Sequence, residues 1–156
     1  MKYWLMKSEP SAFSIDDLIA CENSTDHWDG IRNYQARNFM RDTMEIGDKV
    51  LFYHSNCDEV GVVGLAEVAS EAYPDFTAFD ESCKYYDPKS DPDKPRWVMV
   101  DIKFVEKFDR TVTLKEIKQI DELSNMKLVQ RGMRLSIQPV EEFEYDFIIN
   151  LAKGVL

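Results

Sequence analysis

The chain lacks the features that mark membrane, secreted and metal-binding proteins. No apolar run approaches the ~18 residues of a membrane helix, and the four-residue stretch Tyr3–Met6 is too short for a signal-peptide core. The three cysteines are an odd number, and their spacings of 36 and 26 residues fit no metal or redox motif. The two histidines have no zinc-type spacing. We therefore expect reduced thiols, no metal, no cofactor and no membrane partner.

Motifs of common enzyme classes are also missing. The chain has no G-x-S-x-G elbow, no G-x-x-x-x-G-K-[ST] loop and no G-x-G-x-x-G after a strand. His54 and Ser55 are neighbours, and in an extended segment their side chains point to opposite faces, so they form no nucleophile–base pair. We expect no catalytic activity. Glu9 and His54 stay open as an acid or a base, because both residue types transfer protons.

The composition indicates one globular domain, residues 1–156. Hydrophobic residues make up 44% and charged residues 31% of the 156 positions, values that argue against disorder. The net charge of −10 is unlike that of a general nucleic-acid binder. Segments 31–41 and 126–136 each hold three basic residues and no acid, whereas 71–93 and 141–146 are acidic. The basic segments form either a site for an anionic ligand or ordinary solvated faces.

Apolar patterning predicts strands and helices without regular β-α-β alternation. Expected strands are 2–8, 50–53, 60–68, 96–104 and 135–138. Expected helices are 14–21, 33–42, 113–120 and 141–152, with N-caps at Ser14, Asn33 and Thr113. Gly61 and Gly64 indicate a bulge or the close approach of another group, and 73–95 is expected to be a long loop. The pattern favours an α+β fold with a strongly curved, mainly antiparallel sheet or small barrel.

Two of these segments predict which side chains are buried. Alternate residues from Val98 to Phe104 are expected to face the core, which places Trp97 on the outer face of a half-exposed strand. In the last helix, Phe143, Phe147 and Leu151 form one apolar stripe.

The segment His27–Gln35 combines two aromatic rings, an acid, a guanidinium and two amides around a turn. A planar heterocycle needs such groups, because an aromatic face stacks on it and polar groups bind its edge. Asp29, Arg32, Asn33 and Tyr34 therefore join Trp28 as candidate ligand-binding residues. The alternative is that the aromatic residues belong to the core and Asn33 only caps a helix.

Two further segments place polar side chains at the end or the start of a strand. Tyr53-His54-Ser55 ends a buried strand with three hydrogen-bonding side chains, and Arg134-Leu135-Ser136 has a similar mixture. Each has a structural alternative, namely a core tyrosine with a hydrogen-bonded histidine, and an arginine that neutralises a nearby carboxylate.

Taken together, these motifs resemble those of the EVE domain, found in small bacterial proteins and in the thymocyte nuclear protein family. They run in order through nearly the whole chain, and the ordered set is specific although each motif alone is weak. The matching segments are YWLMKSEP (3–10), WDGIRNYQARN (28–38), GD (47–48) with FYHS (52–55), GLAEV (64–68), PRWV (95–98) and RLSIQPV (134–140).

The resemblance implies a PUA-like fold, in which helices surround a curved sheet or pseudo-barrel, and a distant relation to YTH domains, which hold a methylated adenine in an aromatic cage. It implies that the chain binds a methylated or hydroxymethylated base in DNA or RNA. Trp28 would then be a cage wall and Ser8 would bind the base edge, with Trp97, Tyr53 and Tyr34 as candidates for further walls. The remaining candidates at the pocket or its mouth are Lys7, Glu9, Asp29, Arg32, Asn33, His54, Arg134 and Ser136.

The acidic net charge limits the expected binding mode, because affinity for a phosphate backbone depends on Lys and Arg. We expect one extruded or single-stranded base, held beside a narrow basic rim of Lys7, Arg32, Arg37, Arg131 and Arg134. Two rival functions are an enzyme acting on a nucleotide or modified base and a protein-interaction domain that uses the acidic segment 71–93 and the acidic last helix. The expected location is the cytoplasm of a bacterium, or the nucleus if the source is eukaryotic.

Overall fold

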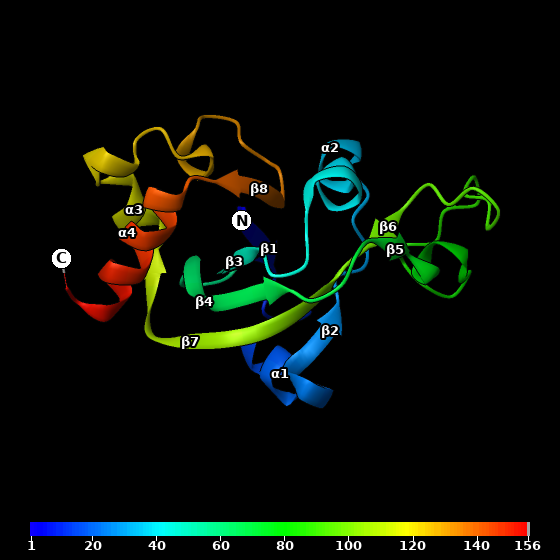
Figure 1. Ribbon diagram of the computed structural model, residues 1–156, viewed down its shortest axis with the longest axis horizontal. Helices are drawn as coiled ribbons and strands as arrows, with labels where there is room; N and C mark the ends of the chain where they lie inside the picture. The colour runs from blue at the N-terminus through cyan, green and yellow to red at the C-terminus, as the bar shows by residue number, and fades with distance from the viewer. Residues whose placement is uncertain (156) are drawn as a thin grey trace.

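A curled six-stranded sheet forms the centre of the computed structural model, which describes residues 1–155 (Figure 1). The strand order is β2-β7-β4-β3-β1-β8, and all neighbours are antiparallel except β1 and β3. This arrangement confirms the predicted α+β class and PUA-like fold with a mainly antiparallel, curved sheet. The strands are β1 (Tyr3–Ser8), β2 (Thr25–His27), β3 (Lys49–His54), β4 (Gly61–Val68), β7 (Asp101–Thr113) and β8 (Ile137–Val140).

The pairing of β4 with β7 contains irregularities that bend the sheet. The register of this pair shifts between Val62 and Gly64 and again between Leu65 and Ala66, and such irregularities bend a strand and increase its twist. A Cβ atom at Gly64 would lie 2.4 Å from both the Glu106 carbonyl oxygen and the Ile15 Cδ1 atom. The predicted close approach at Gly64 is therefore confirmed, and only glycine fits there without displacing backbone.

Two apolar cores lie on opposite faces of the sheet. In β1, Trp4 and Met6 belong to one core and Leu5 to the other, and β3 divides its residues in the same alternating way. This period of two is the one expected for a strand covered on both faces. In Figure 1, α3 (Leu114–Lys118) and α4 (Glu142–Lys153) cover one end of the sheet, and α1 (Ile15–Ala20) lies below it.

Local capping chemistry sets where the helices begin. Ser14 caps α1 in a capping box with Asp17, and the Asn33 side chain accepts the Ala36 N–H at the start of α2 (Tyr34–Asn38), as predicted. A π-helical turn, η2 (Phe39–Thr43), continues α2. Thr113 caps α3, but the Glu116 carboxylate binds Arg110 instead of completing the predicted box. The 3₁₀ turns are η1 (Glu22–Ser24), η3 (Phe76–Phe79), η4 (Asp121–Leu123) and η5 (Lys127–Val129).

The structure corrects the sequence prediction in two strand regions. The polar segment 22–30 contains the short strand β2, which pairs with β7 through the backbone and needs no apolar pattern. The predicted strand 96–104 is divided at Val100 into β6 (Val98–Met99) and the much longer β7. β6 pairs with β5 (Tyr73–Pro74) in a separate two-stranded sheet inside the predicted loop.

One burial prediction fails and another holds only in part. Trp97 is buried rather than on an outer face, because the 73–95 segment folds over it. Of the predicted α4 stripe, Phe147 and Leu151 are partly buried against the core, whereas Phe143 is exposed. The fully buried residues of α4 are Glu144, Tyr145 and Ile148. The α4 face is chosen by its contact with β7, which the helix's own periodicity does not reveal. Within residues 1–155, no helix has the length and apolar character needed to cross a membrane.

Candidate nucleic-acid-binding site

The parallel pairing of β1 and β3 gathers several predicted residues where both strands end. Lys7 lies opposite Tyr53, and Ser8 lies opposite His54. Ser136 joins them because its carbonyl accepts the Lys7 N–H at 2.8 Å. We call these five residues the strand-end cluster. They come from three distant parts of the chain, and the backbone fixes their relative positions.

The half-buried Lys7 and the buried Tyr53 form the cationic part of this cluster. The Lys7 Nζ atom lies 5.5 Å from the centroid of the Tyr53 ring, within the range of a cation–π contact. Burial lowers the pKa of Lys7, because the ammonium loses hydration. Burial also raises the pKa of Tyr53 to about 12, so its hydroxyl stays protonated at neutral pH.

His54 and Ser8 tie the strand ends to the segment that leads into α1. The His54 Nε2 atom accepts the Ile15 N–H at 3.1 Å, and the Ser8 hydroxyl donates to the Phe13 carbonyl at 2.6 Å. Burial lowers the pKa of His54, which agrees with a neutral ring that accepts at Nε2. This nitrogen is already occupied and is not free to act as a base.

Trp28 lies next to this cluster but mostly inside the core. Its side chain is 8% exposed, and its ring meets Phe13 edge-on at 6.4 Å and Phe52 at 5.5 Å. Phe13 therefore connects Trp28 to Ser8, because Ser8 binds the Phe13 carbonyl. The packing agrees with the core alternative for Trp28, and its role as a cage wall stays a prediction.

Three predicted residues, Tyr34, Trp97 and Arg32, form a column of alternating rings and cations with Tyr85 and Lys84, two residues that the sequence analysis missed. Tyr34 stacks on Trp97 with 5.0 Å between ring centroids and 22° between planes. The Arg32 guanidinium carbon lies 5.3 Å from the Trp97 centroid and 5.6 Å from that of Tyr85. Lys84 follows, 5.0 Å from Tyr85. We call these five residues the aromatic–cation stack.

Arg32 is fully occupied inside the protein. Its Nε and Nη2 atoms donate to the Tyr85 carbonyl at 3.0 and 2.7 Å, and Nη1 donates to Asp75 at 3.0 Å. The remaining two donors reach the Ile31 carbonyl and the Thr77 hydroxyl. An arginine has five N–H donors, so Arg32 has none left for a phosphate. It acts instead as the anchor of the 75–87 segment.

Two acids of the 71–93 segment have internal partners. Burial of Asp75 favours a raised pKa, but hydrogen bonds from Thr77, the Gly30 N–H and Arg32 outweigh it and lower the pKa. Asp87 accepts the Trp97 Nε1–H at 2.7 Å, a bond that lowers its pKa. These carboxylates hold Trp97 and the turn after Trp28 in place, a role that charge counting along the sequence does not reveal.

The other predicted residues are more exposed. Arg37 binds the Asn38 side chain and the Arg96 carbonyl. Glu9 is exposed and accepts from Asn56 at 3.3 Å, Asp29 is half-buried, and Asn33 caps α2. Arg134 and Arg131 are both exposed and form no hydrogen bond or ion pair with any side chain or backbone group of residues 1–155.

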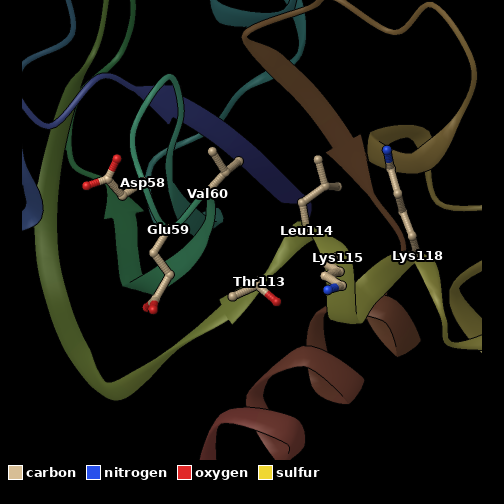
Figure 2. Close-up of a pocket in the computed structure, with 7 residues that line it drawn as sticks. All are labelled: Asp58, Glu59, Val60, Thr113, Leu114, Lys115 and Lys118. Carbon is tan, nitrogen blue, oxygen red and sulfur yellow. The ribbon is translucent and has the colours of Figure 1, made fainter.

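Two surface hollows lie away from these groups. One of about 450 Å³ is bounded by Asp58 and Glu59 on one side and by Lys115 and Lys118 of α3 on the other (Figure 2). The second, of about 410 Å³, lies between η2 and β5. None of the predicted site residues lines either hollow. Across residues 1–155, no group of three or more His, Cys, Asp or Glu side chains is arranged to hold a metal ion.

Comparison with known families matches residues 2–151 to the EVE domain. The chain belongs to the EVE-domain family. The predicted resemblance is therefore confirmed, and the motifs on which it rests include both the strand-end cluster and the 28–38 segment.

Relatives of this EVE domain come from animals, a yeast, a protozoan and bacteria. Human thymocyte nuclear protein 1 is 46% identical over 166 residues, which cover 96% of this chain and 73% of that protein. A hypothetical protein from Leishmania major has a solved structure with a TM-score of 0.93 and 52% identity, covering 99% of this chain and 96% of that one. The human THYN1 protein in complex with 5-methylcytosine containing DNA has a TM-score of 0.92 and 45% identity, covering 98% of both chains.

Proposed function

We propose that this EVE domain binds a modified base, with 5-methylcytosine as the first candidate, in single-stranded or locally opened nucleic acid. The observation that carries the proposal is the human THYN1 structure with 5-methylcytosine containing DNA, because that protein is 45% identical across nearly the whole chain. The proposed contact region is the strand-end cluster together with the neighbouring Trp28.

The chemistry of this region supports the proposal. The Ser8 hydroxyl gives its proton to Phe13 but can still accept a hydrogen bond from a base edge, and Lys7 offers a cation beside an aromatic ring. Arg131 and Arg134 lie just before Ser136 and are free to meet a phosphate, whereas Arg32 is not. A site with few free cations suits a domain that binds one base and makes little contact with the phosphate backbone of the nucleic acid.

We infer that the domain acts by binding and not by catalysis. The two candidate proton-transfer groups support this inference. His54 Nε2 is engaged by the Ile15 N–H, and exposed Glu9 contacts Asn56, a surface residue. A likeness to an ASCH protein from Zymomonas mobilis, at 10% identity and a TM-score of 0.59, shows the fold alone. A protein partner for the exposed acids of segment 71–93 stays a separate hypothesis.

A titration of the parent chain tests the proposed function. Short single strands that carry one 5-methylcytosine or one cytosine in the same sequence are added at low and at physiological salt, and tryptophan fluorescence is recorded. We expect tighter binding of the methylated strand at both salt concentrations. Equal affinity for the two strands, or no binding of either, contradicts 5-methylcytosine as the ligand. A second titration then compares a strand that carries hydroxymethylcytosine with its cytosine control, and it tests the other expected modification.

A further inference from the structure

The ring of Tyr34 is the outermost member of the aromatic–cation stack, on its solvent side. Its side chain is 53% exposed, although Trp97 directly behind it is buried. Most large aromatic residues of this chain lie in the two cores, so an exposed ring held parallel to a buried one needs an explanation. The ring follows Trp28 by six positions and begins α2.

The face of Tyr34 that points away from Trp97 is open. The Arg37 guanidinium carbon lies 4.7 Å from the Tyr34 centroid. It also lies only 5.9 Å from the Trp97 centroid. If Arg37 covered the far face of Tyr34, its distance to Trp97 would be nearly the sum of the two ring separations, so Arg37 lies beside the stack and not across the tyrosine from Trp97.

The Trp97 ring that supports Tyr34 is held in place within the protein. Asp87 fixes the Trp97 indole, and Arg32 is held between Trp97 and Tyr85 by five hydrogen bonds. A ring that stacks on such a fixed support has less conformational freedom to lose when a second planar group stacks on it. Arg37 donates three N–H groups to the Asn38 side chain and the Arg96 carbonyl. Two of its five N–H donors therefore remain beside the Tyr34 ring for a phosphate.

We propose that the open face of Tyr34 stacks on a second base, next along the strand to the modified base, with Arg37 binding the phosphate between them. This inference rests on the proposed function. Tyr34 and the Trp97 ring behind it then form a separate stacking platform for the neighbouring base, and they are not walls of the modified-base pocket. Stacking on an aromatic ring tolerates any base, so the platform lengthens the binding site without adding sequence preference.

The test compares strands that differ only beside the modified base. The first probe is a five-nucleotide strand with 5-methylcytosine at its centre and thymines elsewhere. The second has abasic sites on both sides of 5-methylcytosine, and the third is free 5-methyl-2′-deoxycytidine 5′-monophosphate. Each is titrated into the parent, Tyr34→Ala, Tyr34→Trp and Phe143→Ala. The last variant is the matched control, because Phe143 is an aromatic residue with 55% exposure on the distant helix α4.

We expect Tyr34→Ala to weaken binding of the thymine-flanked strand by roughly 5- to 150-fold, the range for loss of one base stack. Binding of the abasic strand and of the mononucleotide should not change, and Tyr34→Trp should retain full affinity. A 2-aminopurine placed on either side of 5-methylcytosine should lose fluorescence on binding to the parent and regain it with Tyr34→Ala, which also identifies the stacked side.

Equal weakening of all three probes by Tyr34→Ala would overturn the inference, because Tyr34 would then belong to the modified-base pocket. No weakening of any probe would overturn it as well, as would a parent chain that binds none of them. The proposed function fails separately, when the parent binds methylated and unmethylated strands equally. In that case a flank-dependent effect of Tyr34→Ala still supports the platform.

Discussion

The strand-end cluster and the aromatic–cation stack use the same kinds of residue in different ways. Each places a cation against an aromatic ring, Lys7 on Tyr53 and Arg32 on Trp97. In the first, neighbouring strands set the positions through backbone pairing, and the aromatic ring is buried. In the second, side chains from segments far apart in the chain build a column whose last ring faces solvent. Burial, and not residue type, separates a core ring from a ring that is available to a ligand.

The largest expected effect comes from removing Trp28, which joins the core to the strand-end cluster. Trp28→Ala should lower the free energy of unfolding by about 3–5 kcal/mol, the range for a large aromatic residue packed in a core. Urea denaturation of the parent and the variant measures the loss. A loss below about 1 kcal/mol would contradict a core role for Trp28.

Because Trp28→Ala can prevent folding, Trp28→Phe separates the two roles of the side chain. Phe keeps an aromatic ring against Phe13 and Phe52, so most of the stability should remain. If the indole of Trp28 contacts the modified base, the methylated strand should bind Trp28→Phe more weakly than the parent. Unchanged binding would remove Trp28 from the site.

The next effect concerns Arg32, the anchor of the aromatic–cation stack. Arg32→Met should lower the free energy of unfolding by about 2–3 kcal/mol, because Asp75 is left buried without its cation. This value lies below the range for a fully buried pair, since the Arg32 side chain is 22% exposed. Arg41→Met, which removes an exposed pair with Asp42, is the matched control and should change the free energy by no more than about 0.5 kcal/mol.

If the two variants lost equal stability, the structural role of Arg32 would be wrong. Arg32→Met should also increase the exposure of Trp97, because the 75–87 segment is no longer anchored. Binding of 5-methyl-2′-deoxycytidine 5′-monophosphate should change little, since the strand-end cluster does not depend on Arg32. A complete loss of that binding in a folded variant would show that the two regions form one site.

The smallest effect is a pH dependence at the strand-end cluster. Burial lowers the pKa of His54 in the folded chain below its unfolded value near 6.5. The unfolded chain therefore binds a proton first as the pH falls, and the folded state loses stability below about pH 6.5. Above that pH the ring is neutral in both states and the contribution is constant.

Comparison with His54→Gln isolates this contribution, because glutamine can accept the Ile15 N–H and does not titrate. Between pH 7 and pH 5 the parent should lose more stability than the variant, as measured by urea denaturation at each pH. Parallel curves for the two proteins would contradict a neutral, buried His54.

Several features of the fold follow from short stretches of sequence. Short apolar runs identify β1, β3 and β4, and the side chains of Ser14 and Asn33 mark the starts of α1 and α2. The ordered motifs identify the family. Less follows where no local pattern exists. β2 is a polar strand of three residues, and it forms because an edge of β7 is available for pairing.

The fold class, the family and the segments that hold the candidate site follow from the amino-acid sequence alone, because apolar runs, capping residues and motif order depend on residues close together in the chain. What the polar groups do depends on the tertiary fold. Arg32 binds Asp75, which lies 43 positions away in the chain, and His54 accepts the N–H of Ile15, which lies 39 positions away. The partner of a charge or a hydrogen-bond donor depends on which distant segments the fold brings together. For that reason Arg32 is an anchor, Trp97 is buried and Tyr34 remains open.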